Sequence, residues 1–311
     1  MIASNDKAQK LEQIARLYYE QEKTQEEIAG IFGISRPLVS RMLSEAHKAG
    51  IVEIVIHPAD HFANLLLRKI KKQFGLKDGV LLPEVKGDHA LNRSLAVATV
   101  NYMKHKNSRR IGIGWGHIIG TLVEVIREDV ADGSFITEIC PLLGNSGITI
   151  RNYHSNENVR IIAQHIGATP HYLHIPAFVE TKQDLELLMQ TEHFNAVYRE
   201  WENLDAILVN IGNHPSTPDF ASVARYGDLL TSRKAVGRLI AYYFNEKGEI
   251  ISSDSDYAIQ IPIDLLKKCK NVIGVCSANT GPKALLGALR TGLLTCVVAR
   301  EKLVGEVLKS L

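Results

Sequence analysis

Apolar residues recur at helical spacing at the start of the chain and predict three short helices over residues 7–50. Thr24 stands where an N-cap belongs and is followed three residues later by Glu27, which is the pattern of a capping box at the start of the second helix. Gly33 interrupts the apolar pattern, and Ser35 supplies a second N-cap for the third helix. Two helices joined at a glycine that can adopt a positive φ predict a helix-turn-helix.

After about residue 60, apolar segments with strand character alternate with helical ones. A short strand is expected at residues 51–56 and a connecting helix at 65–74. Further strands are expected at residues 80–82, 111–113, 135–143, 172–175, 206–209, 272–275 and 294–298. Helices are expected at residues 90–105, 117–129, 157–167, 184–201, 230–243 and 282–290. This alternation predicts an α/β fold with a mostly parallel sheet wrapped by helices.

Length and composition fit this organisation without adding a function. A chain of 311 residues, 45% hydrophobic and 23% charged, is typical of a soluble protein with two domains, expected here at residues 1–57 and 58–311. The formal net charge of +2 is too small to indicate a nucleic acid, a membrane or an acidic substrate. No segment reaches the roughly 18 apolar residues of a membrane span, and no signal peptide follows Met1. A cytoplasmic protein without a membrane partner is therefore expected.

The metal-ligating residue types show no recognisable metal signature. No two cysteines form a C-x-x-C pair, and their neighbours are apolar, so we expect buried, reduced thiols. The four are Cys140, Cys269, Cys276 and Cys296. His171 and His174 alternate as strand neighbours do, but no third ligand is nearby in the sequence. We therefore expect neither a metal nor another cofactor.

The third predicted helix presents polar and basic side chains that suit DNA. In the segment QEEIAGIFGISRPLVSRMLS the apolar residues form the seam between two helices, which leaves Arg36, Ser40 and Arg41 facing outward, toward base edges and phosphates. Residues 1–57 carry seven basic and eight acidic residues, whereas residues 35–50 carry a net charge of +2. Affinity is therefore expected from a local face and from a second half-site in a dimer. The residues expected to contact DNA are Thr24, Gln25, Ser35, Arg36, Pro37, Ser40 and Arg41. The alternative is an ordinary αα-hairpin of a helical domain.

Four polar loops that contain glycine follow predicted strands. The segment IGIGWGH at residues 111–117 opens a helix, where free N–H groups attract an anion such as phosphate. Its G-x-G-x-G spacing matches neither the dinucleotide fingerprint nor a Walker loop. The other loops are PLLGNSG at 141–147, IGNH at 211–214 and SANTGPK at 277–283. Because the carboxyl ends of parallel strands meet at one edge of the sheet, these loops predict a site for a small polar ligand.

Six segments taken together resemble the SorC family of sugar-responsive bacterial regulators, over nearly the full length of the chain. They are LYYEQEKTQEEIAGIFGISRPLVSRML, IGIGWG, PLLGNSG, HFNAVYREWENLDAILVNIG, KAVGRLIAYYFNEKGEII and GPKALLGALRTGLLTCVV. The resemblance implies a Rossmann-like α/β effector domain similar to sugar-phosphate isomerases and deaminases. It also implies a homodimer or homotetramer on operator DNA, with a sugar or sugar phosphate as effector. Regulators of sorbitol or sorbose utilisation are the most similar in kind.

The resemblance also implies which residues form the effector site. They are Gly114, Trp115, Gly116, His117, Asn145, Tyr153, His154, Asn158, Gly212 and Lys283. His117 stands where relatives often carry Thr or Arg, and Asn145 stands where they usually carry glycine. The chain departs from the family pattern at two further places. Ala278 and Asn279 stand where two glycines are common, and Ala299 and Arg300 replace a frequent Thr-Asp pair. These departures leave open the identity of the effector and the recognition of a phosphate.

Several other residues have competing interpretations. Asp254 and Asp256 have the spacing of paired catalytic acids, but a solvated loop is the simpler reading. Trp201 is expected to pack in the core rather than to stack on a ligand. Lys283 suits a phosphate contact and a solvated position equally well. Leu143 stands at a loop position where a lysine would be needed to form a Schiff base, so covalent capture of an aldehyde is not expected.

The sequence thus predicts a DNA-binding transcriptional regulator of carbohydrate utilisation genes, controlled by a sugar or sugar phosphate, and not an enzyme. The alternative is a sugar-phosphate isomerase or deaminase with an appended DNA-binding domain. That chemistry needs an acid and a base beside C1 and C2 of the sugar. The loop positions show no convincing pairing of a carboxylate with a histidine.

Overall fold

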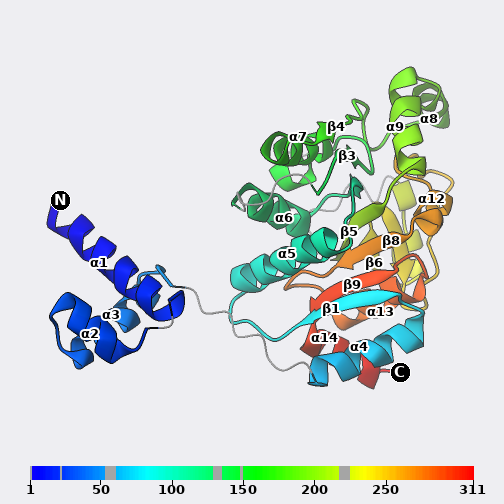
Figure 1. The fold of residues 1–311 in the computed structure, drawn as a ribbon. Helices are drawn as coiled ribbons and strands as arrows, with labels where there is room; N and C mark the ends of the chain where they lie inside the picture. Colours follow the sequence, from blue (N-terminus) through cyan, green and yellow to red (C-terminus); the bar gives the residue numbers. More distant parts are fainter. Residues whose placement is uncertain (1, 22, 53–60, 129–134, 148–149, 217–224) are drawn as a thin grey trace. The chain divides into compact units, whose positions relative to one another are not determined.

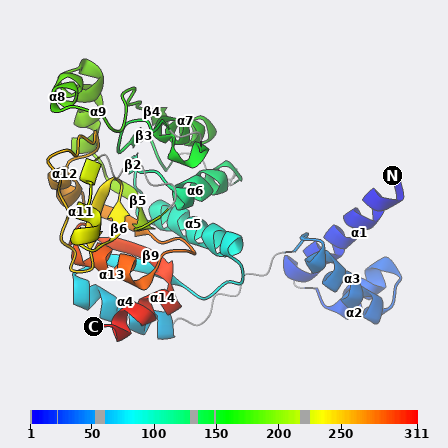
Figure 2. The same ribbon diagram turned by 180° about the vertical axis from the view of Figure 1, so that it is seen from behind.

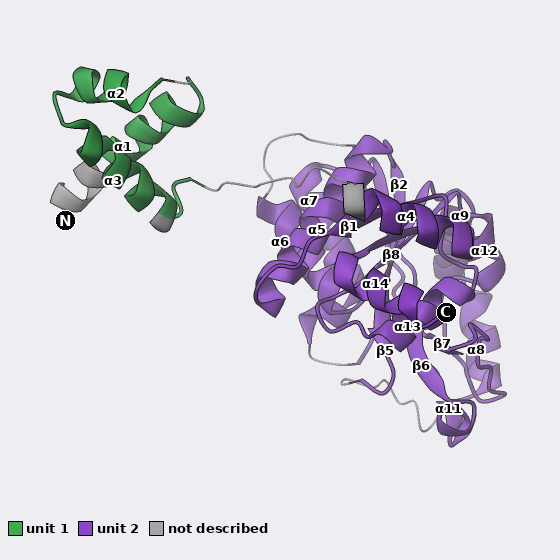
Figure 3. Cartoon of the chain, turned by 90° about the horizontal axis from the view of Figure 1, so that it is seen from below, with its two compact units in different colours: residues 1–60 green, residues 61–311 purple. Residues whose placement is uncertain are grey.

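Two separate units make up the chain, residues 1–60 and 61–311 (Figure 3). The computed structural model describes residues 2–21, 23–52, 61–128, 135–147, 150–216 and 225–311. The boundary expected between residues 57 and 58 lies outside the described residues, as does most of the strand expected at 51–56. None of the described helices is long and apolar enough to cross a membrane.

Unit 1 consists of the helices α1 (Ile2–Tyr19), α2 (Gln25–Phe32) and α3 (Arg36–Lys48). The capping box at the start of α2 is confirmed. The Thr24 hydroxyl accepts a hydrogen bond from the Glu27 amide at 3.3 Å, and the Glu27 carboxylate accepts one from the Thr24 amide at 2.8 Å. The three helices bury one apolar cluster. It contains Leu11, Ile14, Ala15, Ile28, Val39, Met42, Leu43 and Ala46.

The turn between α2 and α3 explains how this cluster closes. Gly33 has a φ of 61°, as predicted, because a left-handed residue is needed to end α2 and redirect the chain. Ser35 precedes α3 but makes no side-chain capping bond. Pro37 lacks an N–H group, and the Leu38 amide already donates to the Ser35 carbonyl at 2.9 Å. The α3 start therefore depends on proline geometry and not on the serine hydroxyl.

Unit 2 contains a parallel sheet with the strand order β1-β9-β8-β5-β2-β3-β4. The strands are β1 (Asp78–Leu82), β2 (Arg110–Ile113), β3 (Glu138–Pro141), β4 (Thr169–Pro170), β5 (Ala206–Asn213), β8 (Asn271–Val275) and β9 (Cys296–Arg300). The chain runs from β2 outward to β3 and β4, then returns to the other side of β2 for β5. The order of the sheet therefore reverses between β2 and β5.

Alternate residues of the central strands face two separate apolar clusters. On β9, Cys296 and Val298 belong to one cluster, whereas Val297 and Ala299 belong to the other. The first cluster is covered by α5 (Asp88–His105), α6 (His117–Glu128) and α7 (Ser155–Ile166) (Figure 1). The second is covered by α4 (His61–Phe74), α13 (Pro282–Arg290) and α14 (Glu301–Lys309) (Figure 2). The result is the predicted Rossmann-like sheet with helices on both faces.

The helix expected at residues 230–243 is wrong. Only α11 (Leu229–Ser232) is helical there, and the rest forms a hairpin of β6 (Ala235–Leu239) and β7 (Tyr242–Asn245). Lys234 and Ile240 have positive φ values, 54° and 57°, which no α-helix tolerates. Strand β6 pairs antiparallel with the end of β5, so a contact far away in sequence overrides the helical spacing of the apolar residues.

Two further expectations differ from the structure. The helix expected at 184–201 is two helices, α8 (Lys182–Met189) and α9 (Glu192–Glu202), because the Thr191 hydroxyl accepts a bond from the Phe194 amide and starts a new helix. The segment 172–175 is not a strand. The side-chain amide of Asn156, on α7, takes the place of a neighbouring strand. Its oxygen accepts a hydrogen bond from the Leu173 N–H at 3.0 Å, and its nitrogen donates one to the Leu173 carbonyl at 3.1 Å. A short helix, α12 (Ile263–Lys268), was not predicted.

Candidate functional sites

Strand order reverses between β2 and β5, and open α/β sheets form a ligand crevice at the carboxyl ends of strands where such a reversal occurs. The chain leaves β2 toward α6 on one face of the sheet, whereas the chain that leaves β8 forms α13 on the other face. Small ligands of open α/β sheets bind where the connections diverge in this way. The glycine loop 114–116 follows β2, and Asn210 to Gly212 form the end of β5. The region at the carboxyl ends of β2 and β5, referred to as the crevice, is therefore the expected position of a ligand site.

The loop 114–116 lies directly against β5. The Gly114 amide donates to the Leu208 carbonyl at 2.9 Å. Gly116 has a φ of 118°, and a Cβ atom at this position would come within 2.7 Å of the Asn210 side-chain nitrogen. Glycine is required here both by the backbone conformation and by the close approach. The Gly116 amide in turn donates to the Asn152 carbonyl at 3.0 Å, which joins the loop to the segment before α7.

Trp115 is buried within this loop. Its indole N–H donates to the Ile240 carbonyl in the β6–β7 turn at 3.3 Å. Its ring packs at 6.0 Å from the Tyr153 ring and 5.9 Å from the Phe178 ring, measured between centroids. Trp115 therefore joins the first glycine loop, the hairpin and the segment around Tyr153.

Two buried amide oxygens close to the loop 114–116 have no hydrogen-bond partner among the described residues. They are the side-chain oxygens of Asn158 and Asn210. Asn158 is fully buried, and its side-chain nitrogen donates to the Asn152 carbonyl at 3.3 Å, so its oxygen is left over. A buried acceptor without a donor costs about 1–3 kcal/mol. Such groups in a crevice are suited to hydroxyl donors of a ligand. The sequence indicated Asn158 but missed Asn210, whose only signal was its place at the end of an apolar strand.

A buried cation lies next to the loop after β5. Arg238 is buried and lies opposite Gly212 in the pairing of β5 with β6. Burial raises the pKa of the Tyr153 phenol, and the nearby Arg238 charge offsets part of this rise. A Cβ atom on Gly212 would come within 3.3 Å of the Arg238 side chain. Arg238 was not predicted, because the residues around it were assigned to a helix, where it would lie far from Gly212.

The remaining sequence-predicted residues are more dispersed. Asn145 exchanges backbone hydrogen bonds with Ile175 and Ala177, and it thereby bridges two loops. His154 is half-buried at the start of α7. His117 is exposed at the start of α6, and Lys283 is exposed in the first turn of α13. The structure thus brings together the loop 114–116, Tyr153, Asn158 and Gly212. The His154 carbonyl also accepts a hydrogen bond from the Asn158 amide at 3.0 Å, whereas the exposed side chains of His117 and Lys283 lie at the starts of two different helices.

The loops after β5 and β8 are fixed to each other by side-chain hydrogen bonds. The Asn213 side chain donates to the Asn279 carbonyl at 2.7 Å and accepts from the Gly281 amide at 2.9 Å. The Thr280 hydroxyl donates to the Ile211 carbonyl at 3.1 Å. Asn279 stands where the family pattern has a glycine, and here its backbone is used to hold this loop in place. Two of the four predicted glycine loops are therefore rigidly connected.

Replacement of Gly116 by alanine tests the crevice. The new Cβ would need a strained positive φ and would displace the Asn210 side chain, so we expect a loss of folding free energy of about 1–3 kcal/mol. We also expect effector affinity to fall at least about tenfold, because one unpartnered amide oxygen moves away from the crevice. Calorimetric titration of the folded variant measures the affinity. Gly167→Ala, at the end of α7, is the matched control, since Gly167 also has a positive φ, 71°, but a Cβ atom there meets nothing within 4 Å; equal affinities in the two variants would contradict the assignment.

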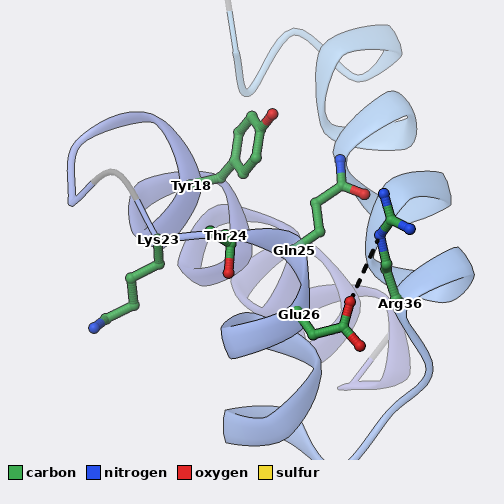
Figure 4. A pocket seen from close by; sticks show the side chains of 6 residues that line it. All are labelled: Tyr18, Lys23, Thr24, Gln25, Glu26 and Arg36. Carbon is green, nitrogen blue, oxygen red and sulfur yellow. Dashed lines mark ion pairs between the residues drawn. The ribbon is translucent and has the colours of Figure 1, made fainter.

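The residues expected to contact DNA gather on one side of unit 1. A hollow is lined by Tyr18, Lys23, Thr24, Gln25, Glu26 and Arg36 (Figure 4). Thr24 and Gln25 mark the start of α2, and Arg36 is the first residue of α3, so the hollow lies between two helix N-termini. Ser35, Pro37, Ser40 and Arg41 are all exposed around the start of α3. The positive dipole ends of both helices suit a phosphate backbone.

One carboxylate pairs with the basic side chain in this hollow. The Arg36 guanidinium lies 3.9 Å from the Glu26 carboxylate (Figure 4). Both side chains are largely exposed, at 66% and 82%. An exposed pair of this kind is worth only about 0–1 kcal/mol. Arg36 can therefore exchange this partner for a phosphate or a base at little cost.

Other sequence interpretations are resolved by the structure. Trp201 packs in the core as expected, with its indole N–H donating to the Pro141 carbonyl at 2.8 Å. Asp256 is not in a solvated loop, because it forms a largely buried ion pair with Arg225. All four cysteines are free and buried, and burial raises the pKa of each thiol. His171 and His174 do not meet: His171 contacts Glu138, whereas His174 contacts Asn156.

The chain is similar to known proteins over nearly its full length. The family model described as "Putative sugar-binding domain" matches residues 61–309. The chain is 29% identical to the sorbitol operon regulator of Klebsiella pneumoniae, over 98% of this chain and 99% of the relative. It is 24% identical to the deoxyribonucleoside regulator of Bacillus subtilis, over 88% of this chain and 89% of the relative.

Solved structures give the same result. The crystal structure of the full-length sorbitol operon regulator SorC from Klebsiella pneumoniae superposes with a TM-score of 0.81 at 26% identity. That match covers 96% of this chain and 98% of the solved chain. It therefore includes both the helix-turn-helix unit and the α/β unit. The chain belongs to the SorC family of sugar-responsive transcriptional regulators.

Proposed function

We propose that the effector is a sugar or sugar phosphate that binds in the crevice between β2 and β5. The observation that carries this proposal is the pair of amide oxygens of Asn158 and Asn210, close to the loop 114–116, which have no partner in the described part of the chain. Sugar hydroxyls are donors that satisfy such acceptors, and the flat Trp115 ring in that loop suits the apolar face of a sugar. Two relatives are named for sorbitol and for deoxyribonucleosides, which supports a carbohydrate ligand.

The positive charge near the crevice supports a phosphorylated effector. The Arg238 guanidinium is buried beside Gly212 and Tyr153, and an arginine can bind a phosphate through two parallel hydrogen bonds. The N-terminus of α6 begins directly after Gly116 and adds a positive dipole end. Lys283 lies in the first turn of α13, where a long side chain can reach a bound anion. His117, Asn145 and His154 complete the proposed surroundings of the ligand.

On the DNA side, we propose that α3 enters the major groove with Arg36, Ser40 and Arg41, while Thr24, Gln25, Ser35 and Pro37 position the backbone. Arg36 and Ser40 are four residues apart and share one face of the helix. The chain is proposed to act as a homodimer or homotetramer, because one such face gives few phosphate contacts and a second half-site multiplies them. The effector would change the spacing of the paired α3 helices and thereby the affinity for the operator.

Binding of labelled DNA tests the regulator function directly. Fluorescence anisotropy would be measured at fixed salt with DNA from upstream of the gene, with and without a panel of sugars and sugar phosphates. We expect one compound to change the affinity roughly 5- to 150-fold, which corresponds to a coupling of about 1–3 kcal/mol. Scrambled DNA of equal length is the control. If the operator and the scrambled DNA bind equally under every condition, the proposed DNA sequence recognition is wrong.

We also propose that the protein regulates by binding and not by catalysis. The histidine–carboxylate contacts of His171 with Glu138 and Glu200 lie where β3 begins, whereas the crevice lies where the strands end. An acid–base pair at that distance cannot act on C1 and C2 of a bound sugar. Coupled assays for aldose–ketose isomerisation and for ammonia release test this. Turnover that depends on Tyr153 or Asn158 would favour the enzyme alternative.

A further inference from the structure

Three metal-ligating side chains converge at the edge of the sheet opposite to the crevice. Glu138 is the first residue of β3, His171 follows β4, and Glu200 lies on α9. The His171 Nε2 atom lies 3.0 Å from a Glu138 oxygen and 3.7 Å from a Glu200 oxygen. One ligand atom of each residue lies within 4.8 Å of the other two. The three elements are far apart in sequence, which is why no metal signature was visible there.

The spacing of these atoms suits a tetrahedral zinc ion. Zinc binds imidazole nitrogen and carboxylate oxygen at about 2.0–2.2 Å, which places two tetrahedral ligand atoms roughly 3.3–3.5 Å apart. The distances of 3.0 and 3.7 Å to His171 bracket this value. The side chains are about a quarter exposed, at 26%, 27% and 24% for Glu138, His171 and Glu200. The three side chains are thus partly accessible, and an ion can reach them from solvent.

The surroundings of the cluster support an ion as its occupant. A small hollow is lined by the three ligands together with Arg110, Ile111, Ile139, Cys140 and Leu204, and it has no room for a water-sized molecule. An organic ligand is therefore too large for this hollow. A single metal ion that replaces the proton between His171 and Glu138 is small enough to fit. Cys140 is not a competing ligand, since burial raises the pKa of its thiol well above neutrality.

Arg110 holds one of the carboxylates in position. Its guanidinium donates two hydrogen bonds to the second oxygen of Glu138, at 3.1 and 3.0 Å. Carboxylates that bind metals usually have such an outer partner, which orients the ligating oxygen. The other Glu138 oxygen, which lies 3.0 Å from His171 Nε2, is thereby oriented toward the cluster.

We propose that Glu138, His171 and Glu200 form a structural zinc site that attaches α9 to the start of β3. Without the ion, the contacts of His171 hold these elements together. When zinc is bound, three metal–ligand bonds connect β3, the segment after β4 and α9. The free energy of zinc binding then adds to the folding stability of unit 2. Imidazole nitrogen as a ligand favours zinc over magnesium, which prefers oxygen ligands only.

The test uses the full chain after treatment with a chelator. Visible absorption during titration with Co²⁺ reports tetrahedral coordination, and thermal unfolding with and without Zn²⁺ reports linkage. We expect one equivalent to bind and the unfolding temperature to rise by roughly 5–10 °C when free zinc is about a hundredfold above its Kd. Magnesium at the same concentration should produce neither signal.

Matched variants assign the signal to these residues. His171→Gln and Glu200→Gln should each weaken binding by at least roughly 10- to 100-fold and remove the rise in unfolding temperature. His174→Gln is the control, because it removes an exposed histidine three residues away and should leave both signals unchanged. If the full chain binds no zinc, or if both ligand variants bind as tightly as the control, the site is an ion pair only and the proposal is overturned. None of these readouts depends on DNA or on the effector.

Discussion

Replacement of Arg225 by methionine is expected to lower the free energy of unfolding of unit 2 by about 3–5 kcal/mol. The Arg225 side chain is 5% exposed, and its Nε atom donates to the Asp256 carboxylate at 2.8 Å. Tyr226 donates to the second oxygen of the same carboxylate. The substitution therefore leaves a carboxylate that is only 14% exposed without its cation. The guanidinium also lies 4.0 Å from the centre of the Phe178 ring, and this cation–π contact is lost as well.

Tryptophan fluorescence during unfolding in urea measures this effect for unit 2 alone. The chain has two tryptophans, Trp115 and Trp201, and both are buried in unit 2. Arg233→Met is the matched control, because Arg233 is exposed, and it should change stability by less than about 0.5 kcal/mol. Asp256→Leu combined with Arg225→Met should recover much of the loss, since no charge then remains unpaired. If Arg225→Met alone lowered the free energy of unfolding by less than about 1 kcal/mol, the Arg225–Asp256 ion pair would not stabilise unit 2 as expected.

Arg36→Ala is expected to weaken operator binding by about 1–3 kcal/mol, a factor of roughly 5 to 150, without changing affinity for the effector. Arg36 is 66% exposed at the first position of α3, so its removal costs little stability. Glu26→Gln should act in the opposite direction, because it removes the carboxylate that pairs with the guanidinium. Anisotropy with labelled operator DNA and calorimetry with the effector measure the two affinities separately.

Arg16→Ala controls for the loss of one positive charge from unit 1. Arg16 is exposed on α1 and pairs with Glu12 and Glu20, away from the hollow between α2 and α3. It should therefore change operator affinity less than Arg36→Ala. Equal losses in the two variants would show that binding depends on net charge alone. Loss of effector binding in Arg36→Ala would contradict the separation of the two functions between the units.

Local sequence rules succeeded where the relevant contacts are close in sequence. The capping box of Thr24 with Glu27 and the positive φ of Gly33 depend on neighbours within a few residues, so the helix-turn-helix could be predicted in detail. The apolar strands of the central sheet were recognisable because both of their faces are buried. The family resemblance and the alternation of elements led to the same α/β fold.

The hairpin β6–β7 shows where these rules fail. Its apolar residues have helical spacing, but Ile211 of β5 pairs with Leu239 of β6, and that contact joins residues far apart in sequence. The error concealed Arg238, since its position beside Gly212 exists only in the hairpin. Asn210 was missed for a related reason: its proximity to Gly116 follows from the order of the strands, which a single sequence does not determine. The proposed zinc ligands Glu138 and Glu200 were missed for the same reason, because their proximity to His171 also depends on how segments far apart in sequence pack together.

The pairing of β1 with β9 affects the order in which the protein becomes functional during synthesis. Asp78 to Leu82 pair with Cys296 to Arg300, so β1 waits for almost the whole of unit 2 to leave the ribosome before its edge of the sheet can close. Unit 1 has its own apolar core and needs none of those residues. A nascent chain therefore carries a folded DNA-reading unit while its sensor is still incomplete. A polypeptide released before β9 is made would lack a closed sheet in its sensor, so the response to the sugar requires translation through this last strand.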